Sequence, residues 1–195
     1  MRANWFIALP FPVASLPAGE RKGLPEGTRP FDPADLHVTV AFLGAVGARR
    51  ALRAWERLES VDALPLIATL GPRAAFGAPR RPSALGLDLD AGGRDGALTR
   101  FISQWRNTLR AAADLTAEER PVRPHVTLGR PPRRTDDAWR RALKGWIDRP
   151  ADHCAVRLDR VALYTRADPD GRRRFREVHT FPPPQPEPSL EPNAD

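Results

Sequence analysis

The chain has 195 residues, of which 41% are hydrophobic and 28% are charged, and its formal net charge is +7. This composition is typical of one large globular domain, and it excludes a fibrous or largely disordered protein. The single cysteine, Cys154, excludes an internal disulfide, and no apolar run approaches the roughly 18 residues of a membrane span. We therefore expect a cytoplasmic protein that has no membrane segment.

The positive charge is compatible with a nucleic-acid partner, because a protein that neutralises phosphates gains affinity by releasing counterions. Only Lys22 and Lys144 are lysines among the 31 basic residues, however. Such an excess of arginine is also typical of proteins from GC-rich genomes. The charge therefore permits nucleic-acid binding without establishing it.

Short segments along the chain are rich in β-branched or alternating apolar residues, which is typical of strands. In chain order they are Trp5–Leu9, Leu36–Leu43, Leu64–Leu70, Ser83–Leu89, Pro124–Leu128, Cys154–Thr165 and Arg174–Phe181. The segment Asp168-Pro169-Asp170-Gly171 predicts a turn, so we expect the last two strands to pair as a hairpin.

Three segments between these strands carry apolar residues at helical spacing. Their apolar stripes are Leu52, Trp55 and Leu58; Leu98, Phe101, Ile102, Trp105 and Leu109; and Trp139, Leu143, Trp146 and Ile147. The tryptophans are therefore expected mostly in the core. From Pro182 onward the chain is Pro-rich, which predicts a disordered tail at 182–195 after one domain at 1–181.

One pattern occurs twice in the chain, as His37-Val38-Thr39-Val40 and as His125-Val126-Thr127-Leu128. Side chains alternate between the two faces of a strand, so His and Thr of each copy point to the same face. Two such strands that face a cleft would place two imidazoles and two hydroxyls around one site. Imidazoles titrate near neutral pH, and this arrangement suits acid/base chemistry on a phosphate.

The duplicated pattern also predicts the architecture. Strands mixed with helices without a regular alternation indicate an α+β fold. The two copies suggest a bilobal, pseudo-two-fold molecule, in which each lobe contributes a strand to a central groove.

Other titratable residues are assigned less distinctive roles. His153 and His179 lack a threonine two positions later and are expected to be structural or surface residues, and Cys154 is expected to be a small buried hydrophobe. Asp35, two residues before His37, either orients the imidazole or is an exposed aspartate at a strand end. The runs Arg172–Arg174 and Arg80–Arg81 either hold an RNA backbone or are simply solvated.

At the two motifs the sequence resembles the two-histidine (2H) phosphoesterases, and specifically the RNA 2′,3′-cyclic phosphodiesterase family, also called 2′-5′ RNA ligase or LigT-like. The resemblance includes Leu36–Gly44 and Pro124–Arg130, with weaker likeness at Trp5–Pro10, Leu163-Tyr164 and Phe175–Pro182. It implies a bilobal α+β fold in which two antiparallel sheets line a central cleft and the helices lie outside.

The resemblance also implies roles for individual residues. His37 would be the proton donor and His125 the proton acceptor, while Thr39 and Thr127 would hold phosphate oxygens. Arg130 stands where the family often has a basic residue that binds substrate. No metal or other cofactor is expected, because the two imidazoles can supply both proton transfers and neither motif has the ligand spacing of a zinc site.

The resulting hypothesis is a monomeric enzyme that hydrolyses RNA 2′,3′-cyclic phosphodiester ends, or a related nucleotide, to 2′-phosphomonoesters. A 2′-5′ RNA ligase would use the same histidines in reverse. A non-catalytic module that binds RNA ends is the alternative from another class. Two titrating imidazoles favour the enzyme, because a binding module needs Arg or Lys at the phosphate instead.

Overall fold

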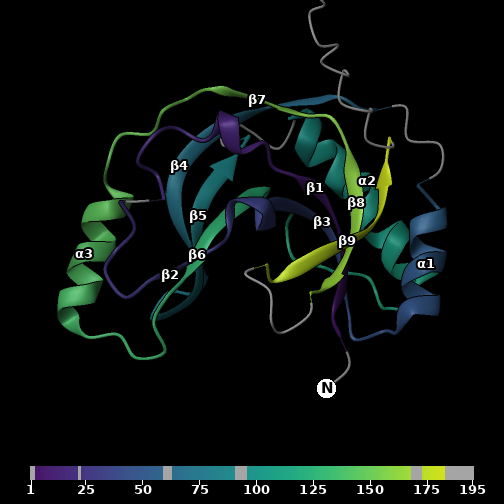
Figure 1. The fold of residues 1–195 in the computed structure, drawn as a ribbon, viewed down its shortest axis with the longest axis horizontal. Coiled ribbons are helices and arrows are strands. Elements are labelled where there is room, and N and C mark those ends of the chain that lie inside the picture. The colour runs from purple at the N-terminus through teal and green to yellow at the C-terminus, as the bar shows by residue number, and fades with distance from the viewer. Residues whose placement is uncertain (1–2, 22, 59–62, 91–95, 168–172, 183–195) are drawn as a thin grey trace, which may run out of the picture.

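The computed structural model describes residues 3–21, 23–58, 63–90, 96–167 and 173–182. These residues form an α+β fold, as predicted, with an antiparallel sheet and helices outside it (Figure 1). The strands are β1 Trp5–Pro10, β2 Arg29–Pro30, β3 His37–Gly44, β4 Leu66–Ala78, β5 Arg81–Leu89, β6 His125–Arg130, β7 Ala155–Leu158, β8 Val161–Arg166 and β9 Phe175–Phe181. The helices are α1 Ala48–Glu56, α2 Ala97–Ala112 and α3 Asp137–Ile147, with short 3-10 turns at Val13–Ser15 and Pro33–Asp35.

The strands form one hydrogen-bonded path in the order β7-β4-β5-β6-β3-β1-β8-β9, and β2 pairs with β6 off this path. The path consists of two four-stranded halves, β7-β4-β5-β6 and β9-β8-β1-β3, which correspond strand for strand. They join at β3 and β6, where one antiparallel pair, Val38 opposite Val126, is in register. The two sheets expected from the family resemblance are therefore continuous at their inner strands, and the two motif strands form the junction.

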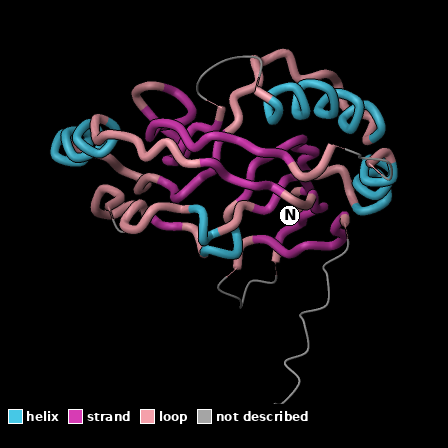
Figure 2. The backbone as a smooth tube through the Cα atoms, turned by 90° about the horizontal axis from the view of Figure 1, so that it is seen from above, coloured by secondary structure: helices cyan, strands magenta, loops and turns pink. Residues whose placement is uncertain are grey.

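The helices lie around the strand layer, as Figure 2 shows from above. The long helix α2 packs against β3 and β4, while α1 packs against α2 and β1 and α3 packs against β4. The predicted apolar stripes explain this packing, because Leu98, Phe101 and Leu109 of α2 and Trp139 and Trp146 of α3 are buried. One hydrophobic cluster runs through both halves of the sheet.

Two strand predictions differ from the structure. β4 extends to Ala78 instead of ending at Leu70, because its pairing with β5 shifts register between Leu70 and Arg73 and so accommodates Gly71-Pro72. The predicted strand Cys154–Thr165 is two strands, since β7 pairs with β4 whereas β8 pairs with β1 and β9. The chain crosses from one half of the sheet to the other between them.

The predicted pairing of the last two strands is confirmed by the β8–β9 ladder, although the expected turn at 168–171 lies outside the described residues. The tail from 183 onward also lies outside them, so its disorder stays a prediction. In the part of the chain that the structure describes, no helix is long and apolar enough to cross a membrane.

Candidate active site

The register between β3 and β6 brings the two motifs together. Because the strands are antiparallel and Val38 is opposite Val126, His37 lies opposite Thr127, and Thr39 lies opposite His125. Both valines are fully buried in the core, so the histidines and threonines share the other face. The junction of the two halves therefore carries a square of two imidazoles and two hydroxyls around the pseudo-two-fold axis.

The two imidazoles are held in the same way. His37 Nδ1 lies 2.7 Å from the backbone oxygen of Asp35, and His125 Nδ1 lies 2.8 Å from that of Arg123. A carbonyl oxygen can only accept a hydrogen bond, so Nδ1 carries a proton in both rings. Nε2 is then the nitrogen that gains or loses a proton in each, as acid/base catalysis by a fixed imidazole requires.

His37 is enclosed by aromatic rings from the strands on its own side. Its ring centroid lies 4.7 Å from that of Phe6, 5.7 Å from that of Tyr164 and 5.5 Å from that of Phe175. Desolvation by this burial lowers the pKa of His37 to about 4, although the hydrogen bond to Asp35 opposes the shift and the charge of His125 adds to it. In the ligand-free protein His37 is therefore neutral at pH 7.

His125 has a more open and more polar environment. One face of its ring stacks on Phe76 at a centroid distance of 4.0 Å. The guanidinium of Arg123 lies 4.8 Å from the centroid of the same Phe76 ring and binds Asp88 through two hydrogen bonds of 2.8 and 2.7 Å. Burial lowers the pKa of His125, but the backbone bond to Arg123 and the negative charge of Asp88 oppose that shift.

Asp35 is not the exposed strand-end residue that the sequence allowed. Its side chain is buried, at 1% exposure, and its carboxylate accepts hydrogen bonds from the backbone N–H groups of Arg174 and Phe175, at 2.8 and 3.2 Å. Its backbone oxygen orients His37. Asp35 is therefore a positioning residue that fixes both the imidazole and the start of β9, which supplies Phe175 to the same ring.

The threonines lie where the sequence predicted them, half-buried beside the two histidines. Among the described residues, neither the Thr39 nor the Thr127 hydroxyl has a hydrogen-bond partner. Both hydroxyls are therefore available to donate to an oxygen of a bound phosphate.

Arg130 ends β6 on the His37 side of the junction, within a group of three arginines, Arg29, Arg130 and Arg174, that we call the Arg130 cluster. The Arg130 guanidinium lies 6.0 Å from the Phe31 ring centroid, and that of Arg174 lies 4.9 Å from the same centroid. Burial and the charges of Arg174 and Arg29 lower the pKa of Arg130. Cations held this close together favour an anion nearby.

The remaining candidates lie away from this junction. His153 and His179 are exposed, and His179 stacks on Trp55 of α1. Cys154 is half-buried, with its thiol 3.7 Å from the backbone oxygen of Ser15. Within the described ranges, no group of three or more His, Cys, Asp or Glu residues could hold a metal ion.

Sequence reasoning missed the neighbours that distinguish the two histidines. Phe76 belongs to the part of β4 beyond the predicted strand Leu64–Leu70. Arg123 was detectable in principle, because it stands two residues before His125, as Asp35 stands two residues before His37. Asp88 could not be found this way, since only the pairing of β5 with β6 places it opposite His125.

Comparisons with known proteins agree with this geometry. No protein-family model matches the chain. A curated RNA 2′,3′-cyclic phosphodiesterase of Archaeoglobus fulgidus is 27% identical over 111 residues, which are 57% of this chain and 60% of that protein. The match thus spans less than two thirds of the relative.

Solved structures are similar over nearly the whole chain. Escherichia coli LigT in complex with 3′-AMP has a TM-score of 0.66 at 20% identity and covers 93% of this chain and 98% of its own. A Thermus thermophilus protein gives a TM-score of 0.65 at 19% identity, covering 91% and 96%, and a structure described as a phosphoesterase gives 0.64 at 20%, covering 93% and 98%. The fold is that of LigT, so the fold implied by the resemblance at the two motifs is confirmed.

Proposed function

We propose that this chain, as a protein of the LigT-like 2H phosphoesterase family, hydrolyses RNA 2′,3′-cyclic phosphodiester ends to 2′-phosphomonoesters. The observation that carries this proposal is the Val38–Val126 register, which sets His37 opposite Thr127 and Thr39 opposite His125 across the β3–β6 junction. This register supports a site in which an imidazole, held through its Nδ1, lies on each side of the bound phosphate. The name of the Archaeoglobus fulgidus relative supports the same activity.

The reaction requires two proton transfers on opposite sides of phosphorus. One imidazole removes a proton from water as the water oxygen bonds to phosphorus. The bond from phosphorus to O3′ breaks in line, and the other imidazole donates a proton to O3′. The products are a 3′-hydroxyl and a 2′-phosphate, and each positioned proton transfer contributes typically about 10² to 10⁴-fold to the rate.

The hydroxyls and an arginine stabilise the charge that moves onto the phosphate. Thr39 and Thr127 donate hydrogen bonds to the non-bridging oxygens, and Arg130 supplies positive charge from the end of β6. These groups are fixed by the strands that carry the histidines, so they are oriented before the substrate arrives. No metal needs to take part in these steps.

The family resemblance assigns His37 as the proton donor and His125 as the acceptor. Because burial holds the pKa of ligand-free His37 at about 4, donation by His37 requires that bound phosphate raise this pKa. A negative charge beside an imidazole acts in that direction. Because one imidazole must be neutral and the other protonated, the dependence of kcat/KM on pH should be bell-shaped. Replacing the base should remove the acidic limb of this pH profile, and replacing the acid should remove the alkaline limb of the profile.

The direct test is incubation with a short oligoribonucleotide that ends in a 2′,3′-cyclic phosphate, with EDTA present, followed by ³¹P NMR of the product. We expect complete conversion to the 2′-phosphomonoester. A 3′-phosphate product would contradict the proposed direction of opening. Activity that is lost in EDTA and restored by a divalent cation would contradict the two-histidine mechanism.

The two alternatives give different results in the same experiment. A 2′-5′ RNA ligase would join the cyclic end to a second strand that carries a free 5′-hydroxyl, and a binding module would return the substrate unchanged. We propose further that residues 1–181 act as one domain, and that the protein works as a monomer in the cytoplasm. Size-exclusion chromatography with light scattering tests the oligomeric state.

A further inference from the structure

A cavity of about 260 Å³ opens beside the His125 end of the site. Thr39 and His125 belong to its wall, so it is continuous with the proposed catalytic position. The side chains that extend it away from the histidines are Phe42, Arg106, Arg110 and Arg120, and we call this part the arginine pocket. Its volume is slightly below the roughly 300 Å³ at which pockets for whole small ligands begin. It therefore fits a part of a larger ligand whose other part lies at the histidines.

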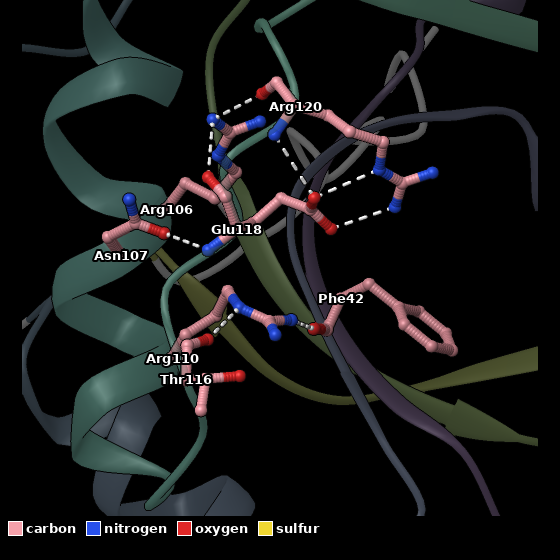
Figure 3. Close-up of polar contacts among 7 residues, drawn as sticks. All are labelled: Phe42, Arg106, Asn107, Arg110, Thr116, Glu118 and Arg120. Atoms are coloured by element: carbon pink, nitrogen blue, oxygen red, sulfur yellow. Dashed lines mark hydrogen bonds and ion pairs between the residues drawn. The ribbon is translucent and has the colours of Figure 1, made fainter.

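The helix α2 supplies two of these arginines from one face. Arg106 and Arg110 are four residues apart, so they project side by side along one edge of the apolar stripe that faces the sheet. Arg106 donates to the backbone oxygens of Glu118 and Arg120, at 3.1 and 2.8 Å. Arg110 donates to those of Thr116 and Phe42, at 2.9 and 2.7 Å (Figure 3). These bonds fix both guanidinium groups at the pocket.

The charges of these two arginines are not balanced locally. Arg120 forms an ion pair with Glu118, and its guanidinium lowers the pKa of that carboxyl to about 2, with a smaller contribution from the charge of Arg110. Arg123, in the same wall, is paired with Asp88. Arg106 and Arg110, by contrast, form no ion pair of their own among the described residues. One carboxylate, Glu118, thus lies among three guanidinium groups.

Arg106 also keeps an unused donor. Its Nε is buried and has no hydrogen-bond partner in the part of the chain that the structure describes. Two guanidinium groups that bind only neutral carbonyl oxygens, one with a free donor, give the pocket a net positive charge. If their purpose were only to hold the loop at 116–120, neutral donors would serve equally well, without bringing two cations together beside an imidazole.

An exposed aromatic ring belongs to the same pocket wall as these cations. The Phe42 side chain is 52% exposed although it belongs to a central strand, because the β1–β3 pairing shifts register between Ile7 and Ala8. In Figure 3 the Phe42 ring and the Arg120 guanidinium extend to the same side of the view. Exposed aromatic rings beside arginines are the usual platform for single-stranded nucleic acids, whose bases stack on the ring while the phosphates meet the cations.

We propose that the arginine pocket binds the nucleotide that adjoins the cyclic end of an RNA strand, with its phosphodiester at Arg106 and Arg110 and its base on Phe42. This inference rests on the proposed function, since it takes the cyclic end to lie between His37 and His125. The pocket makes the protein selective for an oligonucleotide end over a cyclic mononucleotide. A mononucleotide fills the position at the histidines and leaves the arginine pocket empty.

The first test measures binding, which does not depend on turnover. The probe is a fluorescein-labelled tetraribonucleotide that ends in a 2′-phosphate, titrated by anisotropy at several salt concentrations. Each phosphate contact on a single strand contributes about 0.7 to the slope of log Kd against log salt. Arg110→Gln should therefore lower this slope by about 0.7 and raise Kd at least about tenfold. Phe42→Ala should weaken binding about 5-fold or more and leave the slope unchanged, because stacking involves no counterion.

The matched control is Arg140→Gln, which removes the same charge from an exposed arginine paired with Asp137 on α3, at the other edge of the sheet (Figure 1). It should change neither Kd nor slope. Phe42→Ala keeps the test decisive if Arg110→Gln is poorly folded, since the Phe42 ring is already half outside the core. If neither Arg110→Gln nor Phe42→Ala alters the salt slope or the Kd, the proposal is overturned.

The second test compares kcat/KM for a dinucleotide that ends in a 2′,3′-cyclic phosphate with kcat/KM for 2′,3′-cyclic AMP. The ratio should exceed about ten in the unaltered protein and fall several-fold in Phe42→Ala and Arg110→Gln. If both substrates are hydrolysed with a ratio that the variants do not change, the pocket proposal fails and the proposed function stands. If neither is hydrolysed while tetranucleotide binding depends on Arg110 and Phe42, the proposed function fails and the pocket is supported.

Discussion

The His37 and His125 sides of the site share a tetrapeptide pattern and a backbone arrangement, yet they differ in their neighbours. Each imidazole donates from Nδ1 to the carbonyl oxygen two residues earlier. Three aromatic rings then enclose His37, whereas one ring and the Arg123–Asp88 pair flank His125. A duplicated motif thus supplies two equivalent groups, and the surrounding strands make their proton affinities unequal.

The unequal surroundings follow from the topology. β1, β8 and β9 follow β3 in that order in the sheet, and they supply Phe6, Tyr164 and Phe175. β5 lies beside β6 and supplies Asp88, and β4, the next strand outward, supplies Phe76. Division of labour between an acid and a base requires different pKa values, so departures from the pseudo-two-fold symmetry are where the chemistry of this site is decided.

The largest effect is expected when either imidazole is removed. His37→Ala and His125→Ala should each lower kcat/KM for a cyclic-phosphate oligonucleotide by at least about 10²-fold, as for positioned acid/base groups. His179→Ala is the matched control, since this exposed histidine stacks on Trp55 away from the junction and should leave the rate unchanged. Full activity in either His37→Ala or His125→Ala would contradict the two-histidine mechanism.

The pH dependence of stability should separate the two histidines. The folded-state pKa of His37 is about 4, below its ordinary 6.5, so the unfolded chain binds the proton more tightly. The resulting stability is present above pH 6.5 and is lost as the pH falls to about 4. It amounts to something on the order of 3 kcal/mol, at about 1.4 kcal/mol per pKa unit.

Urea unfolding at about pH 7 and about pH 4 measures this difference. His37→Gln should reduce the loss of unfolding free energy between these pH values by more than His125→Gln does, because the shift at His125 is opposed by Asp88. Equal reductions in the two variants would mean that the aromatic enclosure does not set the His37 pKa.

The residues two positions before the histidines should differ in their effect on stability. Asp35→Ala leaves the backbone N–H groups of Arg174 and Phe175 without partners, and we expect it to lower the unfolding free energy by about 2 kcal/mol or more. Arg123→Gln breaks an ion pair in which the Arg123 side chain is 55% exposed and that of Asp88 is 13% exposed, and it should cost less than Asp35→Ala. Chemical denaturation of both variants gives the comparison, and a larger loss for Arg123→Gln would reverse the assignment of Asp35 as the main anchor.

The smallest effect is expected at the Arg130 cluster. Arg130→Gln should raise KM several-fold and change kcat less, because Arg29 and Arg174 maintain most of the positive charge of the cluster. Arg133→Gln, an exposed arginine three residues later, is the matched control. A kcat reduced by about 10²-fold in Arg130→Gln would show that this guanidinium contacts the transition state itself.

Local pattern was sufficient to predict most elements of the fold. Alternating apolar residues identified β1, β3, β5 and β6 to within about two residues, and apolar stripes identified all three helices. The strand predictions were wrong where pairing with neighbouring strands, and not the local sequence pattern, sets the bounds of a strand. A register shift carries β4 past Gly71-Pro72, and the two segments of Cys154–Thr165 pair with different partners.

The sequence by itself determined the chemistry of the site, because two His-x-Thr strands can present only imidazoles and hydroxyls on one face. It could not determine which imidazole has the more strongly lowered pKa. That depends on Phe6, Tyr164 and Phe175 around His37 and on Asp88 opposite His125, which are distant in the chain. Desolvation and charge act through space, so the tertiary structure alone decided how two copies of one motif came to differ.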